Sequence, residues 1–142
     1  LAAYLSFLTD EVQDTPTYTV HPGVTDILDQ THSAPERFAV GLGTGNIEHG
    51  AQIKLARGRL DAHFAFGGFG SDSEDRGELL RIGAQRGAER LGAAVDACRV
   101  VVIGDTPRDV AAAQQIGAEG VDQVGQRHEI RGDESSTVRT AG

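Results

Sequence analysis

The sequence predicts an α/β fold, a doubly wound parallel sheet with helices on both faces. Short apolar runs alternate along the chain with segments of helical periodicity, and strands that are separated by helical crossovers pair in parallel. Two of the apolar runs end in turns of small residues that open a helix, as strand-to-helix connections in such sheets do. With 142 residues and 39% apolar content, the chain is long enough for one domain with a sizeable core.

Each element is predicted from periodicity, helix-capping residues and β-branched runs. The first half is expected to hold a leading helix, a helix packed by Val24, Ile27 and Leu28, and a strand that leads into a third helix. The second half is expected to hold an aromatic strand, a long helix, a β-branched strand, a short helix and a weak last strand. The expected ranges are helix 1–13, helix 22–30, strand 38–42, helix 46–57, strand 64–69, helix 75–91, strand 100–104, helix 107–116 and strand 120–124.

The turn after the β-branched strand is the most informative of these connections. Residues 100–103 are wholly apolar, which is typical of a parallel strand covered on both faces. Thr106 suits the N-cap of the next helix and Pro107 its first position. The turn therefore carries two carboxylates, Asp105 and Asp109, that can converge on a magnesium ion. The alternative is that Asp105 caps the turn while Asp109 complements the helix dipole.

A second turn, after the strand at 38–42, is suited to an anion. Gly43 and Gly45 allow close approach of the backbone, Thr44 supplies a hydroxyl, and the following helix begins with its positive dipole end. The G-x-G-x-G spacing differs from the dinucleotide fingerprint, which needs G-x-G-x-x-G and an acid about 20 residues later. The alternative is a tight strand-to-helix connection with no ligand.

A lysine on the inward stripe of the next helix strengthens the anion hypothesis. Ile47, Ala51 and Leu55 form this stripe, and Lys54 falls within it. Because helical side chains lean toward the helix N-terminus, Lys54 is expected to point back toward the turn at Thr44. The alternative is a lysine whose stem covers apolar surface while its head reaches water.

Together these motifs resemble the haloacid dehalogenase superfamily, in particular its phosphoglycolate-phosphatase-like branch. Residues 18–28 resemble the approach to the core domain, residues 44–55 the second motif with the helix behind it, and residues 104–109 the fourth motif. The resemblance runs over nearly all of the chain and implies a Rossmann-like core. It implies that residues 1–17 are the tail of a cap or leading helix and that residues 18–142 are a core domain, incomplete at both ends.

The resemblance implies a phosphomonoester phosphatase that works through an aspartyl-phosphate intermediate with one Mg²⁺. Thr44 would bind the transferring phosphoryl group through its hydroxyl, helped by the backbone amides of Gly45 and Asn46. Lys54 would supply the neutralising cation of the third motif. Arg76 is the second candidate for that cation.

The resemblance also implies that Asp105 ligates the magnesium, and that Asp109 ligates it through water or holds the lysine. The attacking aspartate of the family lies in an Asp-x-Asp motif, and no two aspartates in this sequence have that spacing. The nucleophile and the general acid/base have no counterpart among the motifs. Because the sequence begins with a leucine and contains no methionine, we expect a piece of a longer polypeptide, inactive alone, whose nucleophile strand is missing.

Composition limits the partners. The net charge of −8 argues against nucleic acid and anionic membranes, because phosphate backbones are bound by clustered Lys and Arg. The single cysteine excludes an intrachain disulfide, and nothing resembles a signal peptide, so a cytoplasmic protein is expected. The expected ligand is a small phosphorylated metabolite. A homo-oligomer or strand exchange is also expected, because a missing central strand leaves open sheet edges.

Three functions follow from the sequence. The first is the core of a Mg²⁺-dependent phosphatase. The second is a non-catalytic relative that keeps the phosphate and metal pocket as a binding module. The third is an unrelated nucleotide-binding α/β domain that uses the glycine-rich turn.

Overall fold

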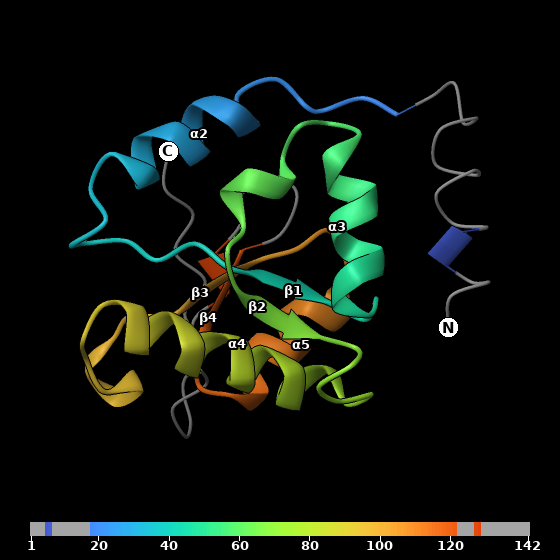
Figure 1. Cartoon of the computed structure of the whole chain (residues 1–142). Helices are drawn as coiled ribbons and strands as arrows, with labels where there is room; N and C mark the ends of the chain where they lie inside the picture. Colours follow the sequence, from blue (N-terminus) through green and yellow to red (C-terminus); the bar gives the residue numbers. More distant parts are fainter. Residues whose placement is uncertain (1–4, 7–17, 122–126, 129–142) are drawn as a thin grey trace. The chain divides into compact units, whose positions relative to one another are not determined.

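The computed structural model describes residues 5–6, 18–121 and 127–128. The chain forms two compact units, Leu1–Cys98 and Arg99–Gly142, which we call the first and the second unit. Each unit has a short parallel strand pair with helix packed on it (Figure 1). Among the described residues, no helix is both long enough and apolar enough to cross a membrane.

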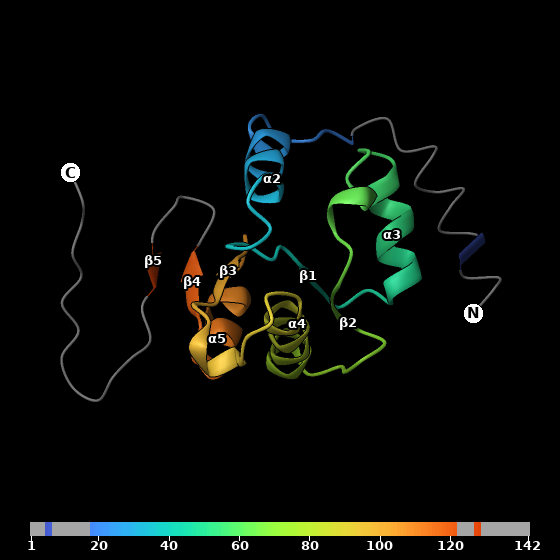
Figure 2. The ribbon, with the colours of Figure 1, turned by 60° about the vertical axis from the view of Figure 1, so that its left-hand side comes forward.

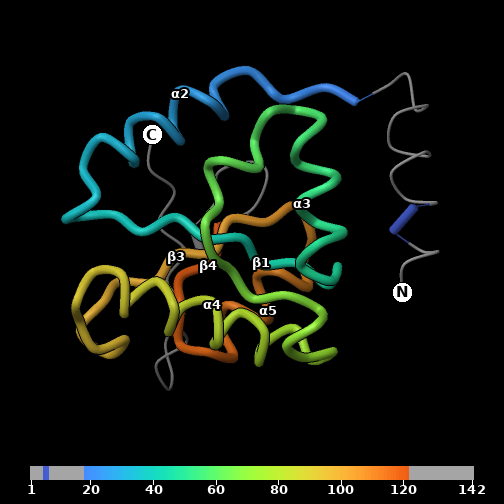
Figure 3. The backbone as a smooth tube through the Cα atoms, viewed as in Figure 1, coloured from blue at the N-terminus to red at the C-terminus, as the bar shows by residue number. Residues whose placement is uncertain are grey.

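The first unit is built on the parallel pair β1 and β2, in which Leu42 lies opposite Gly67 and Thr44 opposite Phe69. The chain passes from α2 into β1 (Figure 3), and α3 forms the crossover to β2. The long helix α4 packs against both strands (Figure 2). In chain order the elements are α2 (Val24–His32), β1 (Leu42–Thr44), α3 (Glu48–Ala56), η1 (Asp61–His63), β2 (Gly67–Phe69), α4 (Arg76–Arg90) and η2 (Val95–Ala97).

Helix α4 packs closely on β2 because glycines lie at the contact. A Cβ atom at Gly83 would lie 2.9 Å from the amide nitrogen of Gly68 and 3.3 Å from the carbonyl carbon of Gly67. A Cβ atom at Gly68 would overlap the carbonyl of Leu79, and the Leu79 side chain is buried. Glycine weakens a helix by about 1 kcal/mol relative to alanine. At Gly83 the helix is weakened in this way, but the missing side chain allows the contact between helix and strand.

The second unit contains β3 (Val101–Ile103), α5 (Pro107–Gln115), β4 (Glu119–Val121) and β5 (Arg127–His128). β3 and β4 are parallel, with Val102 opposite Gly120, and β5 is antiparallel to β4. α5 packs on β3 and β4, and its Ala112 and Ala113 are buried. These small side chains allow the helix to lie close to the sheet.

The α/β class and the order of helices and strands agree with the prediction between residues 18 and 121. Thr106 is the N-cap of α5 and Pro107 its first residue, as predicted. The single doubly wound sheet stays a prediction, because the described strands form one parallel pair in each unit. Of the predicted helix 1–13, only residues 5–6 are described, as helix. The domain boundary after residue 17 therefore stays a prediction too.

Three of the predicted strands, 38–42, 64–69 and 100–104, are shorter in the structure. The predicted strand 38–42 is wrong: the ladder begins at Leu42, whose amide donates to the Phe66 carbonyl at 3.1 Å, and continues through β1. Phe38 lies before the ladder and is 46% exposed. The predicted strand 64–69 shortens to β2 and follows the short helix η1, which was not predicted. Apolar periodicity marks where a strand can form, whereas its length depends on the partner strand.

β3 differs from the prediction of a strand covered on both faces. Val101 is 42% exposed and Ile103 is 78% exposed. In the second unit, β4 pairs with β3 and α5 packs against it. Alternate side chains of a strand point to opposite faces, so these two residues share one face of β3, which the described residues of the second unit leave exposed. The self-association expected from the sequence stays a prediction.

Replacing Gly83 with alanine is expected to destabilise the first unit, although alanine is the better helix former. The added methyl group would meet backbone atoms of β2, and overpacking of this kind costs about 1–3 kcal/mol. Chemical denaturation measures the change in the free energy of unfolding. Gly45→Ala is the matched control, since no heavy atom outside its chain neighbours lies within 4 Å of the added Cβ. A stabilised Gly83→Ala variant would contradict the assignment of Gly83 to the close contact between α4 and β2.

Candidate functional site

The first part of the candidate site is a hydrogen-bonded group of side chains at the end of β1. Thr44 is the last residue of β1, and its Oγ1 accepts hydrogen bonds from the backbone nitrogen of Asn46 at 3.1 Å and from Asn46 Nδ2 at 2.9 Å. The Nζ of Lys54, on α3, donates to Asn46 Oδ1 at 3.1 Å. All three residues are partly buried. We call Thr44, Asn46 and Lys54 the Thr44 cluster.

Lys54 reaches back to the turn before its own helix, as its place on the inward stripe predicts. It is the only lysine in the sequence. Its partner is Asn46, so the charged head lies beside the Thr44 turn while the stem runs along α3. The structure therefore brings the cation and the hydroxyl into one cluster. Their roles in a reaction stay predictions.

The backbone of the turn differs in one respect from the scheme implied by the resemblance. The amide of Asn46, expected to bind phosphate, donates to Thr44 Oγ1. This is the local bond that a threonine commonly makes to the backbone two residues on. Gly45 lies at an open position, because no heavy atom outside its chain neighbours lies within 4 Å of where its Cβ would be. In contrast, a Cβ at Gly43 would meet the end of the Leu80 side chain on α4, which is flexible.

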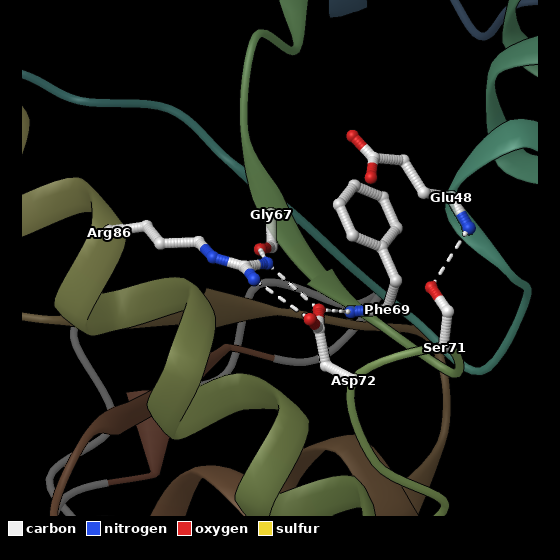
Figure 4. Close-up of polar contacts among 6 residues, drawn as sticks. All are labelled: Glu48, Gly67, Phe69, Ser71, Asp72 and Arg86. Atoms are coloured by element: carbon white, nitrogen blue, oxygen red, sulfur yellow. Dashed lines mark hydrogen bonds and ion pairs between the residues drawn. The ribbon is translucent and has the colours of Figure 1, made fainter.

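The loop after β2 lies against the Thr44 turn. The amide of Gly70 donates to the Asn46 carbonyl at 2.8 Å, and a Cβ at Gly70 would overlap the Gly45 carbonyl. The amide of Glu48, the first residue of α3, also points to Ser71 Oγ at 3.4 Å (Figure 4). The carboxyl ends of β1 and β2 are therefore joined at one edge of the strand pair, where ligands of parallel sheets bind.

Asp72 holds this second loop in place. Its carboxylate accepts two hydrogen bonds from Arg86, each 2.8 Å, and one from the Phe69 amide at 2.9 Å, while Arg86 also donates to the Gly67 carbonyl at 2.7 Å (Figure 4). The guanidinium of Arg86 holds the pKa of Asp72 below its usual value. The sequence analysis missed this pair, because no local spacing rule joins a loop aspartate to an arginine on the far part of α4.

Arg76, the second candidate for the cation, is the first residue of α4 and is partly buried. It follows the loop that Asp72 holds. Helix α4 is capped immediately before it by Asp75, whose carboxylate accepts from the Glu78 amide at 2.7 Å. The structure shows Lys54 at the Thr44 turn, which supports the preference for Lys54, and a role for Arg76 stays a prediction.

The second part of the candidate site lies in the second unit, in the turn between β3 and α5. Asp109 is buried, at 5% exposure, and its Oδ2 accepts from the Thr106 amide at 3.1 Å and from Thr106 Oγ1 at 2.8 Å. Gly104 is required here, since a Cβ would overlap the side chain of Asp109. Asp109 thus acts first as a capping residue of α5. Asp105 stands at the end of β3 and is exposed.

The fit of these residues to a magnesium ion rests on Asp105. Within the described part of the chain, no three His, Cys, Asp or Glu side chains form a group that could hold a metal. Magnesium often keeps several waters and is held by one or two carboxylates together with substrate phosphate. An exposed carboxylate such as Asp105 fits that donor set, whereas one oxygen of Asp109 already accepts two hydrogen bonds.

The structure therefore brings Thr44, Gly45, Asn46 and Lys54 together in the first unit, and it places Asp105 and Asp109 in one strand-to-helix turn of the second. That both parts bind one ligand stays a prediction. A parallel α/β fold with a hydroxyl, an amide and an ammonium group at a strand end is typical of proteins that bind an oxyanion there.

Comparison with known families identifies the class of protein. A family model described as haloacid dehalogenase-like hydrolase matches residues 2–117, more than half of the 142 residues. The chain therefore belongs to the haloacid dehalogenase-like hydrolases. A search of curated proteins finds no match. The family agrees with the resemblance seen in the sequence, while the phosphoglycolate-phosphatase-like branch and the missing nucleophile strand stay predictions.

The ion pair of Asp72 and Arg86 is expected to make stability depend on pH. The folded-state pKa of Asp72 is lowered, so its contribution is present above the unfolded-state pKa of about 3.9 and is lost as the pH falls through the lower, folded-state pKa. Asp72→Asn should therefore cost about 1 kcal/mol at pH 7. The difference from wild type should shrink below about pH 4.

Denaturant unfolding at a series of pH values measures this difference. Asp29→Asn, at an exposed position of α2, is the matched control and should stay within about 0.5 kcal/mol of wild type throughout. A cost of Asp72→Asn that is unchanged at acid pH would contradict the assignment of the stabilisation to the charged pair.

Proposed function

We propose that this chain provides the phosphoryl-binding core of a Mg²⁺-dependent phosphomonoesterase that acts on a small phosphorylated metabolite through an aspartyl-phosphate. The observation that carries the proposal is the Thr44 cluster, in which the only lysine of the sequence is held at a hydroxyl-bearing turn after a parallel strand. Membership of a hydrolase family supports the reaction class. It also argues against an unrelated nucleotide-binding domain.

The Thr44 turn offers hydrogen-bond donors and a cation, which are the groups that phosphoryl transfer needs. Negative charge spreads over the equatorial oxygens of the phosphoryl group in the transition state, and fixed donors and cations stabilise it. Lys54 supplies a positive charge that is already positioned by Asn46, and Thr44 supplies a hydroxyl. The open position at Gly45 lets an oxyanion approach the backbone. Positioned donors of this kind need little rearrangement during the reaction.

Asp105 would hold the magnesium ion, which, when bound, neutralises charge on the phosphoryl oxygens. Asp109 would act on Asp105 indirectly, because its bonds to Thr106 fix the turn from which Asp105 projects. Because no aspartates have Asp-x-Asp spacing, we propose that the attacking carboxylate is supplied by residues other than these 142. The same observation favours a second candidate, a non-catalytic module that binds phosphate and metal.

The phosphate site is tested by titrating the chain with inorganic phosphate, with and without Mg²⁺, by calorimetry. Thr44→Val should weaken phosphate binding about tenfold or more, because a hydrogen bond to a charged group contributes about 1.5–3 kcal/mol. Thr25→Val, at an exposed position of α2, is the matched control and should change little. Asp105→Asn should remove the effect of Mg²⁺ on phosphate affinity, whereas Asp29→Asn should not. A wild-type chain that binds no phosphate would refute the proposal.

Turnover separates the phosphatase core from the binding module. These 142 residues alone are expected not to hydrolyse an aryl phosphate above background, because no residue fills the role of nucleophile. A polypeptide in which an Asp-x-Asp strand precedes them should hydrolyse it, and a continued lack of turnover would favour the module. Turnover by the present chain that Asp105→Ala abolishes would contradict the assignment of the nucleophile to other residues.

A further inference from the structure

In the Thr44 cluster, the Thr44 hydroxyl already accepts two hydrogen bonds. A hydroxyl oxygen has two lone pairs and one hydrogen. The backbone nitrogen and the side-chain Nδ2 of Asn46 both donate to Oγ1, at 3.1 and 2.9 Å. With two donors already on the oxygen, the hydrogen is what Thr44 has left for a further partner. Toward a ligand, Thr44 is therefore a donor.

Lys54 determines which way the amide of Asn46 faces. An ammonium group has three donors and no acceptor, so the amide atom 3.1 Å from Lys54 Nζ must be the oxygen Oδ1. The other amide atom, Nδ2, then faces Thr44. The orientation of the Thr44 hydroxyl thus depends on Lys54, which lies eight residues after Asn46 in the sequence, with Asn46 as the link.

We infer that Asn46 is a positioning residue: it fixes Thr44 as a hydrogen-bond donor and holds Lys54, and so makes the turn selective for a tetrahedral oxyanion that carries no hydrogen. The inference rests on the proposed function and names the protonation state of its ligand. A phosphate that keeps a hydrogen would bring a donor to a turn whose hydroxyl and ammonium groups also donate. Sulfate or the dianion of a phosphate monoester offers acceptors only.

The alternative is that Asn46 only shapes the turn. In that case its side chain would matter for stability and not for the choice of ligand. Asn46→Asp separates the two roles, because aspartate has nearly the same shape and can still accept from Lys54. It cannot donate to Thr44. Its carboxylate would instead accept a hydrogen bond from the Thr44 hydroxyl, which would then no longer donate to a ligand.

The test measures the affinity of the full 142-residue chain for inorganic phosphate and for sulfate by calorimetry. At pH 8, Asn46→Asp should weaken phosphate binding about tenfold or more, since a donor to a charged ligand is lost. Asn46→Ala, which adds no charge, should lose about threefold or more, since a neutral hydrogen bond is removed. Gln52→Glu adds a negative charge at an exposed position of α3, the helix that carries Lys54, and should lose about twofold at most, as screened surface charges act weakly.

A second readout addresses ligand choice directly. At pH 5.5 inorganic phosphate mostly keeps an extra hydrogen, whereas sulfate carries none. The wild-type chain should then bind sulfate about fivefold or more tightly than phosphate, because the hydrogen on phosphate meets donors. In Asn46→Ala, which leaves the charge of the turn unchanged, this preference should shrink, because Thr44 can then present a lone pair to the ligand. A role in shaping the turn would leave the preference unchanged.

The outcomes distinguish the inference from the proposed function. If the wild-type chain binds neither phosphate nor sulfate, the proposed function fails and the inference fails with it. If the wild type binds phosphate and both Asn46 variants bind it equally well, the inference is overturned while the proposed function stands. Should Asn46→Asp fail to fold by circular dichroism, Asn46→Ala decides the question by the same criteria.

Discussion

The parallel pairing of β1 with β2 is the constraint on which the candidate site depends. It sets Thr44 opposite Phe69, so the two loops that follow leave the strands at the same edge. The bond from the Gly70 amide to the Asn46 carbonyl then joins the loops, and α3 returns Lys54 to this edge. A slip of one residue would turn Thr44 to the other face of the strand, and Asn46 would lose its contact with the second loop.

Both turns of the candidate site satisfy a polar side chain with local bonds. Burying a polar group without a partner is costly, and among the described residues no buried side-chain nitrogen or oxygen lacks a hydrogen-bond partner. In the first unit a hydroxyl accepts from the amide two residues on, and in the second a buried carboxylate, Asp109, accepts from its own N-cap. The turns are thus held by hydrogen bonds of their own side chains, and prepositioned groups are suited to binding a ligand.

The features that the sequence predicts correctly are those decided by residues near one another in the chain. The capping of α5 by Thr106, Pro107 and Asp109 depends on residues that are neighbours in the chain, and the direction of Lys54 follows from the lean of helical side chains. The pair of Asp72 with Arg86 and the short β1 depend on partners distant in sequence. Gly83 illustrates the difference. The sequence shows only a glycine that weakens a helix, whereas the structure shows that this glycine allows α4 to pack closely on β2.

The two turns offer opposite chemistry, and this contrast is the strongest physical argument for the proposed ligand. The Thr44 cluster presents an ammonium group and a hydroxyl whose lone pairs are occupied, so it suits an anion. The turn after β3 presents the exposed carboxylate of Asp105, while the neighbouring carboxylate of Asp109 is buried and hydrogen-bonded. Exposed carboxylate oxygen suits a hard cation. Each turn by itself therefore offers what one component of the proposed magnesium and phosphate pair needs.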